Sequence, residues 1–373
     1  MNTRPRRIAM LAPVLLLFAA ACDTGAQTLI VTFRGMAPLA ATATDQNGQS
    51  FTVTGLSGLT WLQDTRFAAV MDNSDKVVFL DVTLNPDGSI VSATIAGGLT
   101  LSESRDFEGI AFTTIQRDSF FLSEEGTPSV REFSRSTGAL LQTLATPAVF
   151  LNRRSNLGFE SLARHPAGAE LWTANEEALT LDSAPSTPKK GTLVRLLRYS
   201  LVDDSATPAQ QFAYRTEPMH GGAIAGGRSG LVDLAVLPDG KVLALERSLA
   251  LSLPNLFQTR LYELDFASAT DVSGFANGLT GQTFTPVAKR LLWTGSLGNL
   301  EGLAIGPLLA NGDRSLLAIV DDGDALSTSH LVAFELVDPV RLPCAANLSR
   351  SAGSDLAHAP ASVVDCVRDA LRP

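Results

Sequence analysis

Glu108-Gly109-Ile110-Ala111 is one of five short segments that share a pattern, in which Leu or Ile is followed by Ala or Thr. The other four are Ser57-Gly58-Leu59-Thr60, Glu160-Ser161-Leu162-Ala163, Val232-Asp233-Leu234-Ala235 and Glu301-Gly302-Leu303-Ala304. After a fairly constant interval each segment is followed by an apolar run that ends in a carboxylate, namely Asp72, Glu124, Glu176, Glu246 or Asp321. Such an interval suits two short antiparallel strands and their turn. The repeat therefore predicts a sheet unit whose acids recur at one structural position.

The spacing of these units indicates the fold class. A strand-rich unit that recurs every ~50 to 70 residues is typical of a β-propeller, with one sheet per blade around a central channel. Third and fourth strands follow the first pair in four units, but the last unit lacks an outer strand, which a strand expected at residues 28–33 could supply. We therefore predict an all-β propeller of five or six blades over residues 28–338. A tail at 339–373 follows, and its apolar spacing predicts a short helix.

Composition limits the partners that the chain can have. Its 373 residues are 45% hydrophobic and 18% charged, so a large core can be buried. The net charge of -9 argues against a broad surface for nucleic acid, because nucleic-acid-binding proteins usually carry a basic face. We expect a monomer with no nucleic-acid partner.

The N-terminus has the layout of an export signal. Basic residues precede an apolar run at 8–18 and then a stretch of small residues that ends before Cys22. We expect a signal peptide at 1–21 and a short tether at 22–27. The segment 19–22 resembles a bacterial lipobox, which implies lipidation at Cys22 and anchoring to a membrane of the cell envelope. Ordinary cleavage after Ala21 is the alternative. Cys344 and Cys366 are expected to pair as a disulfide, as is usual in exported proteins.

Several common catalytic motifs are absent from the sequence. It has no G-x-S-x-G elbow, P-loop, C-x-x-C pair or H-E-x-x-H motif, and its four histidines are scattered. What remains is a set of acids at equivalent strand ends, which also includes Glu125, Glu177 and Asp322. Carboxylates crowded together repel one another unless a cation compensates, and Ca²⁺ prefers oxygen ligands. The predicted ligands are Asp72, Glu108, Glu124, Glu160, Glu176, Glu246, Glu301 and Asp321. Alternatively, these acids cap turns or pair with neighbouring arginines.

Longer segments around these acids carry a family resemblance. They are Asp106 to Ala111, Phe121 to Glu125, Asn156 to Ala163, Trp172 to Glu177, Leu231 to Ala235, Leu245 to Ser248 and Asn299 to Ala304. They closely resemble the bacterial "esterase-like activity of phytase" family, in order, from about Gly55 to Leu336. The resemblance implies an exported β-propeller that is distantly similar to the alkaline calcium-dependent phytases. Those enzymes bind bridging calcium ions and the substrate phosphate in the channel.

The resemblance implies a hydrolase that acts on a small phosphate ester with Ca²⁺ in the channel. Glu160 and Glu301 are the expected catalytic acids, and Arg247 either contacts a phosphate or carboxylate or only neutralises Glu246. The segment 321–324 departs from the family, which often has Asp-Asp-Asn there, and basic residues are fewer than phytate would require. Two alternatives therefore stay open: a non-catalytic envelope propeller that binds a ligand or protein around a structural Ca²⁺, and a lactonase-like or esterase-like propeller.

Overall fold

The computed structural model describes residues 29–202, 205–221, 227–251, 255–321 and 328–338. The predicted signal peptide, Cys22, the tail helix and the Cys344 to Cys366 disulfide lie outside these residues, as does Asp322. Among the described residues no helix is long and apolar enough to span a membrane.

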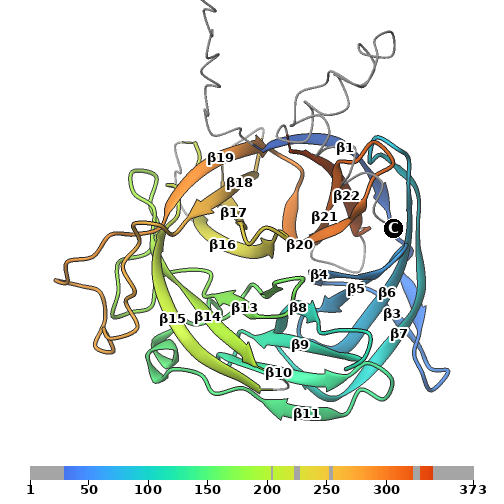
Figure 1. The fold of residues 1–373 in the computed structure, drawn as a ribbon, viewed down its shortest axis with the longest axis horizontal. Coiled ribbons are helices and arrows are strands. Elements are labelled where there is room, and N and C mark those ends of the chain that lie inside the picture. Colours follow the sequence, from blue (N-terminus) through green and yellow to red (C-terminus); the bar gives the residue numbers. More distant parts are fainter. Residues whose placement is uncertain (1–28, 203–204, 222–226, 252–254, 322–327, 339–373) are drawn as a thin grey trace, which may run out of the picture. The chain divides into compact units, whose positions relative to one another are not determined.

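Five four-stranded antiparallel sheets form the blades of a propeller (Figure 1). Blade 1 contains β4 (Leu56–Gln63), β5 (Arg66–Met71), β6 (Ser74–Leu84) and β7 (Ile90–Arg105), and blade 2 contains β8 (Phe107–Phe112), β9 (Ser119–Glu124), β10 (Ser129–Ser134) and β11 (Leu140–Thr143). Blade 3 contains β12 (Ala163–Arg164), β13 (Glu170–Ala174), β14 (Leu193–Val202) and β15 (Ser205–Arg215). Blade 4 contains β16 (Gly227–Val236), β17 (Val242–Ala250), β18 (Phe257–Asp265) and β19 (Ala288–Gly295). The all-β propeller is confirmed, and the blade number left open by the sequence is five.

Blade 5 is completed from the other end of the chain, as the sequence predicted. Its strands β20 (Asn299–Leu308), β21 (Arg314–Asp321) and β22 (His330–Val337) take β1 (Ile30–Pro38) as their outer strand. The two outermost strands pair antiparallel from Ile30 opposite Val337 to Pro38 opposite His330. An ion pair between Arg34 and Glu335 adds a side-chain link. The ring is thus closed by hydrogen bonds between the first and last strands of the propeller.

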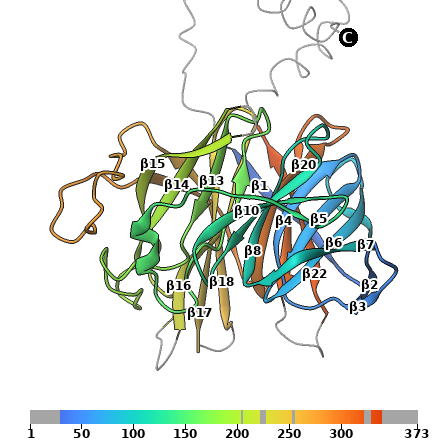
Figure 2. The ribbon, with the colours of Figure 1, turned by 90° about the horizontal axis from the view of Figure 1, so that it is seen from below.

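The core lies between the blades. Five clusters of buried apolar side chains each join two neighbouring sheets, as where Phe107 and Phe133 of blade 2 meet Val77 of blade 1. Strands covered on both faces require long apolar stretches, which explains the hydrophobic runs in the sequence. Outside the ring lie a hairpin of β2 (Thr42–Thr44) and β3 (Ser50–Thr52), seen at the edge in Figure 2, and the 3₁₀ helix η1 (Ala148–Asn152).

The channel is narrowest at the second residue of the repeated segments, where the backbones of neighbouring inner strands come into contact. A Cβ added at Gly58, Gly109 or Gly302 would lie 2.4 to 2.6 Å from backbone atoms of the adjoining blade. Only glycine allows this approach. In blade 4 the same position is Asp233, whose carboxylate accepts hydrogen bonds from the N–H groups of Leu162 (3.3 Å), Leu234 (2.8 Å) and Leu303 (2.6 Å).

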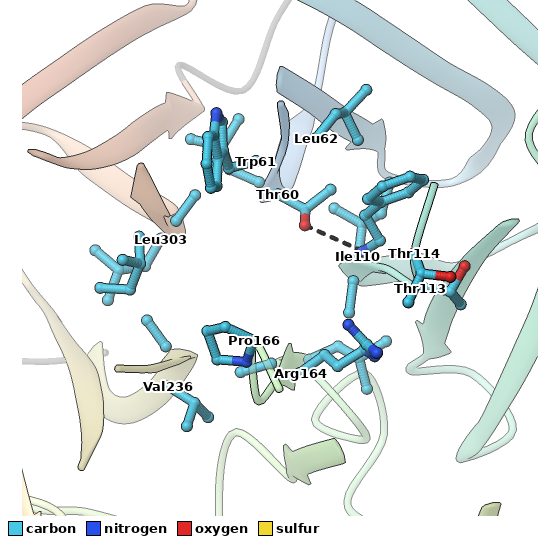
Figure 3. Close-up of a pocket in the computed structure, with 18 of the residues that line it drawn as sticks. Thr60, Trp61, Leu62, Ile110, Thr113, Thr114, Arg164, Pro166, Val236 and Leu303 are labelled. Atoms are coloured by element: carbon cyan, nitrogen blue, oxygen red, sulfur yellow. Dashed lines mark hydrogen bonds between the residues drawn. The ribbon is translucent and has the colours of Figure 1, made fainter. Parts of the chain in front are cut away.

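This constriction divides the channel into two ends. The inner strands all run in one direction, so residues before the constriction lie at one end and residues after it at the other. Glu108, Glu160 and Glu301 precede it, and they mark what we call the acid end. The residues that follow it line a largely apolar hollow at the opposite end (Figure 3).

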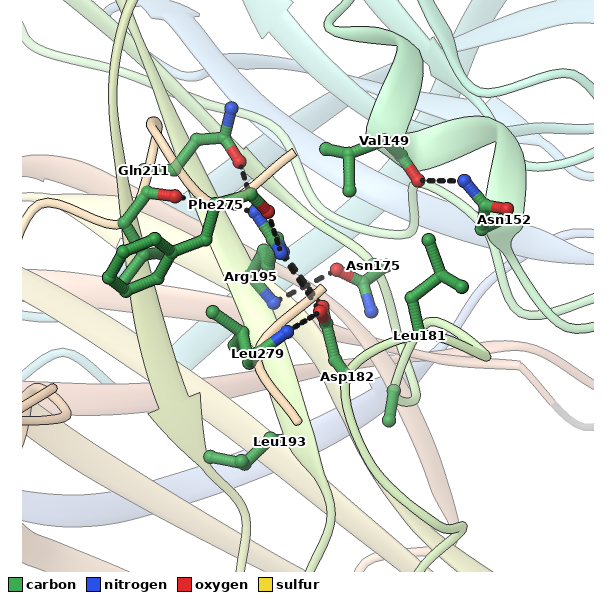
Figure 4. Close-up of polar contacts among 12 residues, drawn as sticks. Val149, Asn152, Asn175, Leu181, Asp182, Leu193, Arg195, Gln211, Phe275 and Leu279 are labelled. Carbon is green, nitrogen blue, oxygen red and sulfur yellow. Dashed lines mark hydrogen bonds and ion pairs between the residues drawn. The ribbon is translucent and has the colours of Figure 1, made fainter. Parts of the chain in front are cut away.

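A long excursion in blade 4 explains why a sixth sheet seemed possible from the sequence. Residues 266–287 leave the ring between β18 and β19 and pack on blade 3, where a buried ion pair holds them (Figure 4). Both side chains of the pair are inaccessible, with Arg195 Nε 2.7 Å from Asp182 Oδ2. Arg195 also donates to the Phe275 carbonyl, and Asp182 accepts from the Leu279 N–H, each at 2.9 Å. The excursion is therefore tied to the blade by paired charges.

Candidate metal centre at the acid end of the channel

Two rings of side chains meet at the acid end. The inner ring comes from the first position of each repeated segment and consists of Ser57, Glu108, Glu160, Val232 and Glu301. The outer ring comes from the last part of the second strand of each blade or from the residues just after it. Each member pairs through its backbone with the residue that lies three positions before the constriction in the same blade. The members are Asp72, Glu125, Glu176, Arg247 and Asp321. Blade 4 has no acid in either ring and contributes an arginine instead.

Five carboxylates form two adjoining groups that share Glu108. The ligand oxygens of Asp72, Asp106 and Glu108 lie within 4.8 Å of one another, and so do those of Glu108, Glu125 and Glu160. Oxygen-only donor sets of this kind suit a hard divalent cation such as Ca²⁺. Glu160 Oε2, Glu301 Oε2 and Asp106 Oδ1 are buried and have no hydrogen-bond partner in the described part of the chain. Unpaired buried carboxylate oxygens are costly unless a cation binds them, so the donor set fits a metal ion.

Arg247 is the compensating charge already present in the ring. Its guanidinium contacts Glu301, Asn299 Oδ1 at 2.7 Å and Glu176 Oε1 at 2.8 Å. These nearby carboxylates raise its pKa against the opposing effect of burial. The structure thus pairs Arg247 with Glu176 and Glu301, and the alternative in which it neutralises Glu246 is wrong.

Crowding and burial strongly shift the pKa values of the carboxylates at the acid end. Burial, followed by a hydrogen bond with Asp72 and the charge of Asp72, raises the pKa of Asp106 to about 6. Burial, followed by the charge of Glu176, raises the pKa of Glu125 to about 8. Burial raises the pKa of Glu301 to about 7, although the charge of Arg247 opposes the shift. Burial also raises the pKa values of Glu108 and Glu160 well above their ordinary range. Without a cation, each of these groups is harder to ionise than an ordinary carboxyl, and Glu125 stays largely protonated at neutral pH.

The raised pKa values predict a stability that falls with rising pH in chelator-treated protein. An acid whose folded pKa exceeds its unfolded value stabilises the fold fully below the unfolded pKa, and this stabilisation is lost as the pH rises through the folded pKa. The window runs from the ordinary 4.5 of glutamate to about 8 for Glu125. We expect the free energy of unfolding to fall by roughly 5 kcal/mol across it, measured by urea denaturation. Glu125→Gln should flatten the curve, and a profile that rises with pH would contradict the prediction.

The structure separates the predicted ligands into two sets. Asp72, Glu108 and Glu160 belong to the carboxylate groups. Glu176 and Glu301 lie beside these groups and form ion pairs with Arg247. Asp321 is a member of the outer ring. Glu124 and Glu246 point elsewhere. Glu124 accepts from Ser129 Oγ at 2.8 Å and pairs with Arg131 at 3.1 Å. Glu246 accepts from Tyr214 and from Lys289, each at 2.5 Å.

Two members of the carboxylate groups, Asp106 and Glu125, were not among the predicted ligands. Glu125 follows Glu124 directly, and adjacent residues of a strand face opposite sides. Nothing in the sequence distinguishes the two. Asp106 lies two residues before Glu108, just before β8 begins, and that spacing was the signal that could have found it.

The fold and this site define a class: five-bladed β-propellers with a carboxylate-rich centre at one end of the channel. The sequence model of the phytase-like family, described as "Esterase-like activity of phytase", matches residues 52–324, which is most of the chain. The chain belongs to this family, and the resemblance drawn from its motifs is confirmed.

Solved structures similar to the chain have low sequence identity to it. An endo-arabinase from Bacteroides thetaiotaomicron has 13% identity and a TM-score of 0.43, covering 78% of this chain and 98% of its own. The Myxococcus xanthus glutaminyl cyclase has 13% identity and a TM-score of 0.37, with 83% and 98% covered. The Pseudomonas aeruginosa periplasmic gluconolactonase has 13% identity and a TM-score of 0.35, with 83% and 99% covered. No curated protein matches the chain significantly.

Proposed function

We propose that this protein is a Ca²⁺-dependent phosphoric ester hydrolase that acts at the acid end of its propeller channel. The observation that carries the proposal is the pair of adjoining carboxylate groups, together with buried carboxylate oxygens that have no partner in the described residues. Asp72, Asp106, Glu108, Glu125 and Glu160 would hold the metal. When bound, Ca²⁺ would supply positive charge against the ester oxygens and favour ionisation of a water molecule.

Glu301 is the residue best suited to move a proton. Its pKa of about 7 matches the working range of a general base at neutral pH. Arg247 fixes its orientation through Glu301 Oε1, which leaves the buried Oε2 available. Glu160 lies inside the carboxylate group, so we assign it to the metal. Arg228, which is partly exposed and 3.7 Å from Glu176, is a cation that could contact a substrate phosphate.

One observation favours a second function, a non-catalytic propeller with a structural Ca²⁺. Both terminal nitrogens of Arg247 bind protein groups, so its fork is already engaged by Glu176, Asn299 and Glu301. An arginine engaged in this way stabilises the ring and offers little to a substrate. A recognition propeller in the cell envelope would need no more than this.

Calorimetric titration of Ca²⁺ into chelator-treated protein tests both functions, combined with melting curves and a panel of phosphate esters, lactones and carboxylic esters. We expect binding, a higher melting temperature and Ca²⁺-dependent hydrolysis of phosphate esters. Glu301→Gln should abolish turnover while the protein stays folded and still binds Ca²⁺. Binding without turnover would support the recognition propeller. Hydrolysis confined to lactones or carboxylic esters would show that phosphate esters are not the substrate class. Absence of binding would overturn both proposals.

The location of the protein belongs to the proposal as well. Export to the cell envelope with a lipid on Cys22 rests on the N-terminal sequence pattern alone. Mass spectrometry of the protein purified from its natural host, with Cys22→Ala as the control, measures the lipid directly.

A further inference from the structure

The hollow at the opposite end of the channel has a composition unlike that of the acid end. It has a volume of about 320 Å³, within the range of small-molecule sites, and all five inner strands contribute to it. Its walls include Leu59 and also Trp61, Ile110, Val236 and Leu303. Figure 3 shows these last four around a common space. Such walls would exclude water from an apolar ligand.

A single charged side chain, Arg164, stands among the described residues that line this hollow. It lies at the rim between Pro166 and the Thr113–Thr114 pair (Figure 3). Burial lowers its pKa, and no carboxylate pairs with it in the described part of the chain. A half-buried cation without a counter-charge is unfavourable, and an anionic ligand would relieve it.

Hydroxyl groups in the hollow offer further donors to a ligand. Thr60 Oγ1 accepts from the Phe112 N–H at 3.1 Å, and Thr114 Oγ1 accepts from the Arg117 N–H at 3.1 Å. Because each oxygen accepts, its O–H remains able to donate toward a ligand. Thr114 also lines, together with Arg164, a smaller hollow of about 100 Å³ next to the first.

We infer that this hollow is a second binding site, for a small amphipathic monocarboxylate. The apolar body of the ligand lies inside the hollow, and its carboxylate binds Arg164. An arginine fork recognises a carboxylate through paired charge-assisted hydrogen bonds. The constriction at Asp233 separates this site from the acid end, so the inference is independent of the proposed function.

Octanoate is the probe, and Trp61 at the rim provides the signal. We expect saturable binding to the full-length protein by calorimetry, with a change in tryptophan fluorescence. Octanol and octyltrimethylammonium, which share the chain length without the negative charge, should bind at least about tenfold more weakly, because a charge-assisted hydrogen bond is lost. Trp61→Phe should retain binding and lose the fluorescence change.

Arginine variants locate the carboxylate. Arg164→Gln should weaken octanoate binding about tenfold or more and leave octanol unaffected, whereas Arg164→Lys should retain most of the affinity. Arg135→Gln is the matched control, because Arg135 pairs with Asp118 on the surface outside the hollow. Equal binding of octanoate and octanol, an unchanged affinity in Arg164→Gln, or a fluorescence change that persists in Trp61→Phe would each overturn the inference.

Discussion

Glu108→Gln is expected to weaken Ca²⁺ binding by about 10- to 100-fold, since one charge-assisted contact contributes about 1.5 to 3 kcal/mol. Glu108 has the largest effect of any single acid because both carboxylate groups include it. The substitution keeps the side-chain size and removes a buried group that is costly to ionise. In chelator-treated protein the variant should therefore be at least as stable as the natural chain at pH 8. Calorimetry and melting curves with and without Ca²⁺ measure both effects.

Adjacent glutamates supply the control for this prediction. Glu125→Gln should weaken Ca²⁺ binding, whereas Glu124→Gln should leave it unchanged, because Glu124 faces Ser129, Arg105 and Arg131 instead. Equal losses in the two variants would show that the strand does not aim these side chains as described. An unchanged Ca²⁺ affinity in Glu108→Gln would show that Ca²⁺ does not bind at the acid end.

Asp233→Ala is expected to destabilise the folded protein by about 3 to 5 kcal/mol. The carboxylate satisfies backbone N–H groups of blades 3, 4 and 5, and each buried donor left unpaired costs about 1 to 3 kcal/mol. Because one side chain links three inner strands, the loss should appear as lower stability of the whole ring. Urea denaturation at fixed pH gives the free energy of unfolding.

Asp239→Ala is the matched control on the same blade. Asp239 is exposed and pairs with Lys241, so its loss should change the free energy of unfolding by less than about 1 kcal/mol. If Asp233→Ala is no less stable than Asp239→Ala, the carboxylate does not hold the constriction together.

The propeller could be predicted from the sequence because its period is long and its strands are bounded by clear turns. Even the closing strand at Ile30 was predicted, from the missing outer strand of the last unit. The sequence left a sixth blade possible because apolar residues of the excursion, such as Val272 and Leu279, resemble strand residues. In the structure they pack on blade 3 without forming a sheet.

The candidate site was predicted less well because of one-residue shifts within strands. The inner strands of blades 1, 2, 4 and 5 each contain an irregularity at the repeated segment, as between Phe107 and Ile110. Such bulges, and turns of unequal length, change the count between paired strands. A shift of one residue exchanges Glu124 for Glu125 and Glu246 for Arg247. Spacing thus locates the strand end, but only the register shows which neighbour faces the channel.

The closure of the ring also sets the order of events during synthesis. Arg34 and Glu335 are 301 residues apart in the chain, yet they are paired across β1 and β22. Strand β1 therefore waits, without its sheet, until almost the whole propeller has been made. Pairing over this separation is slow because a very large loop must be closed. While it waits, the unpaired β1 leaves backbone groups exposed that can pair with other chains.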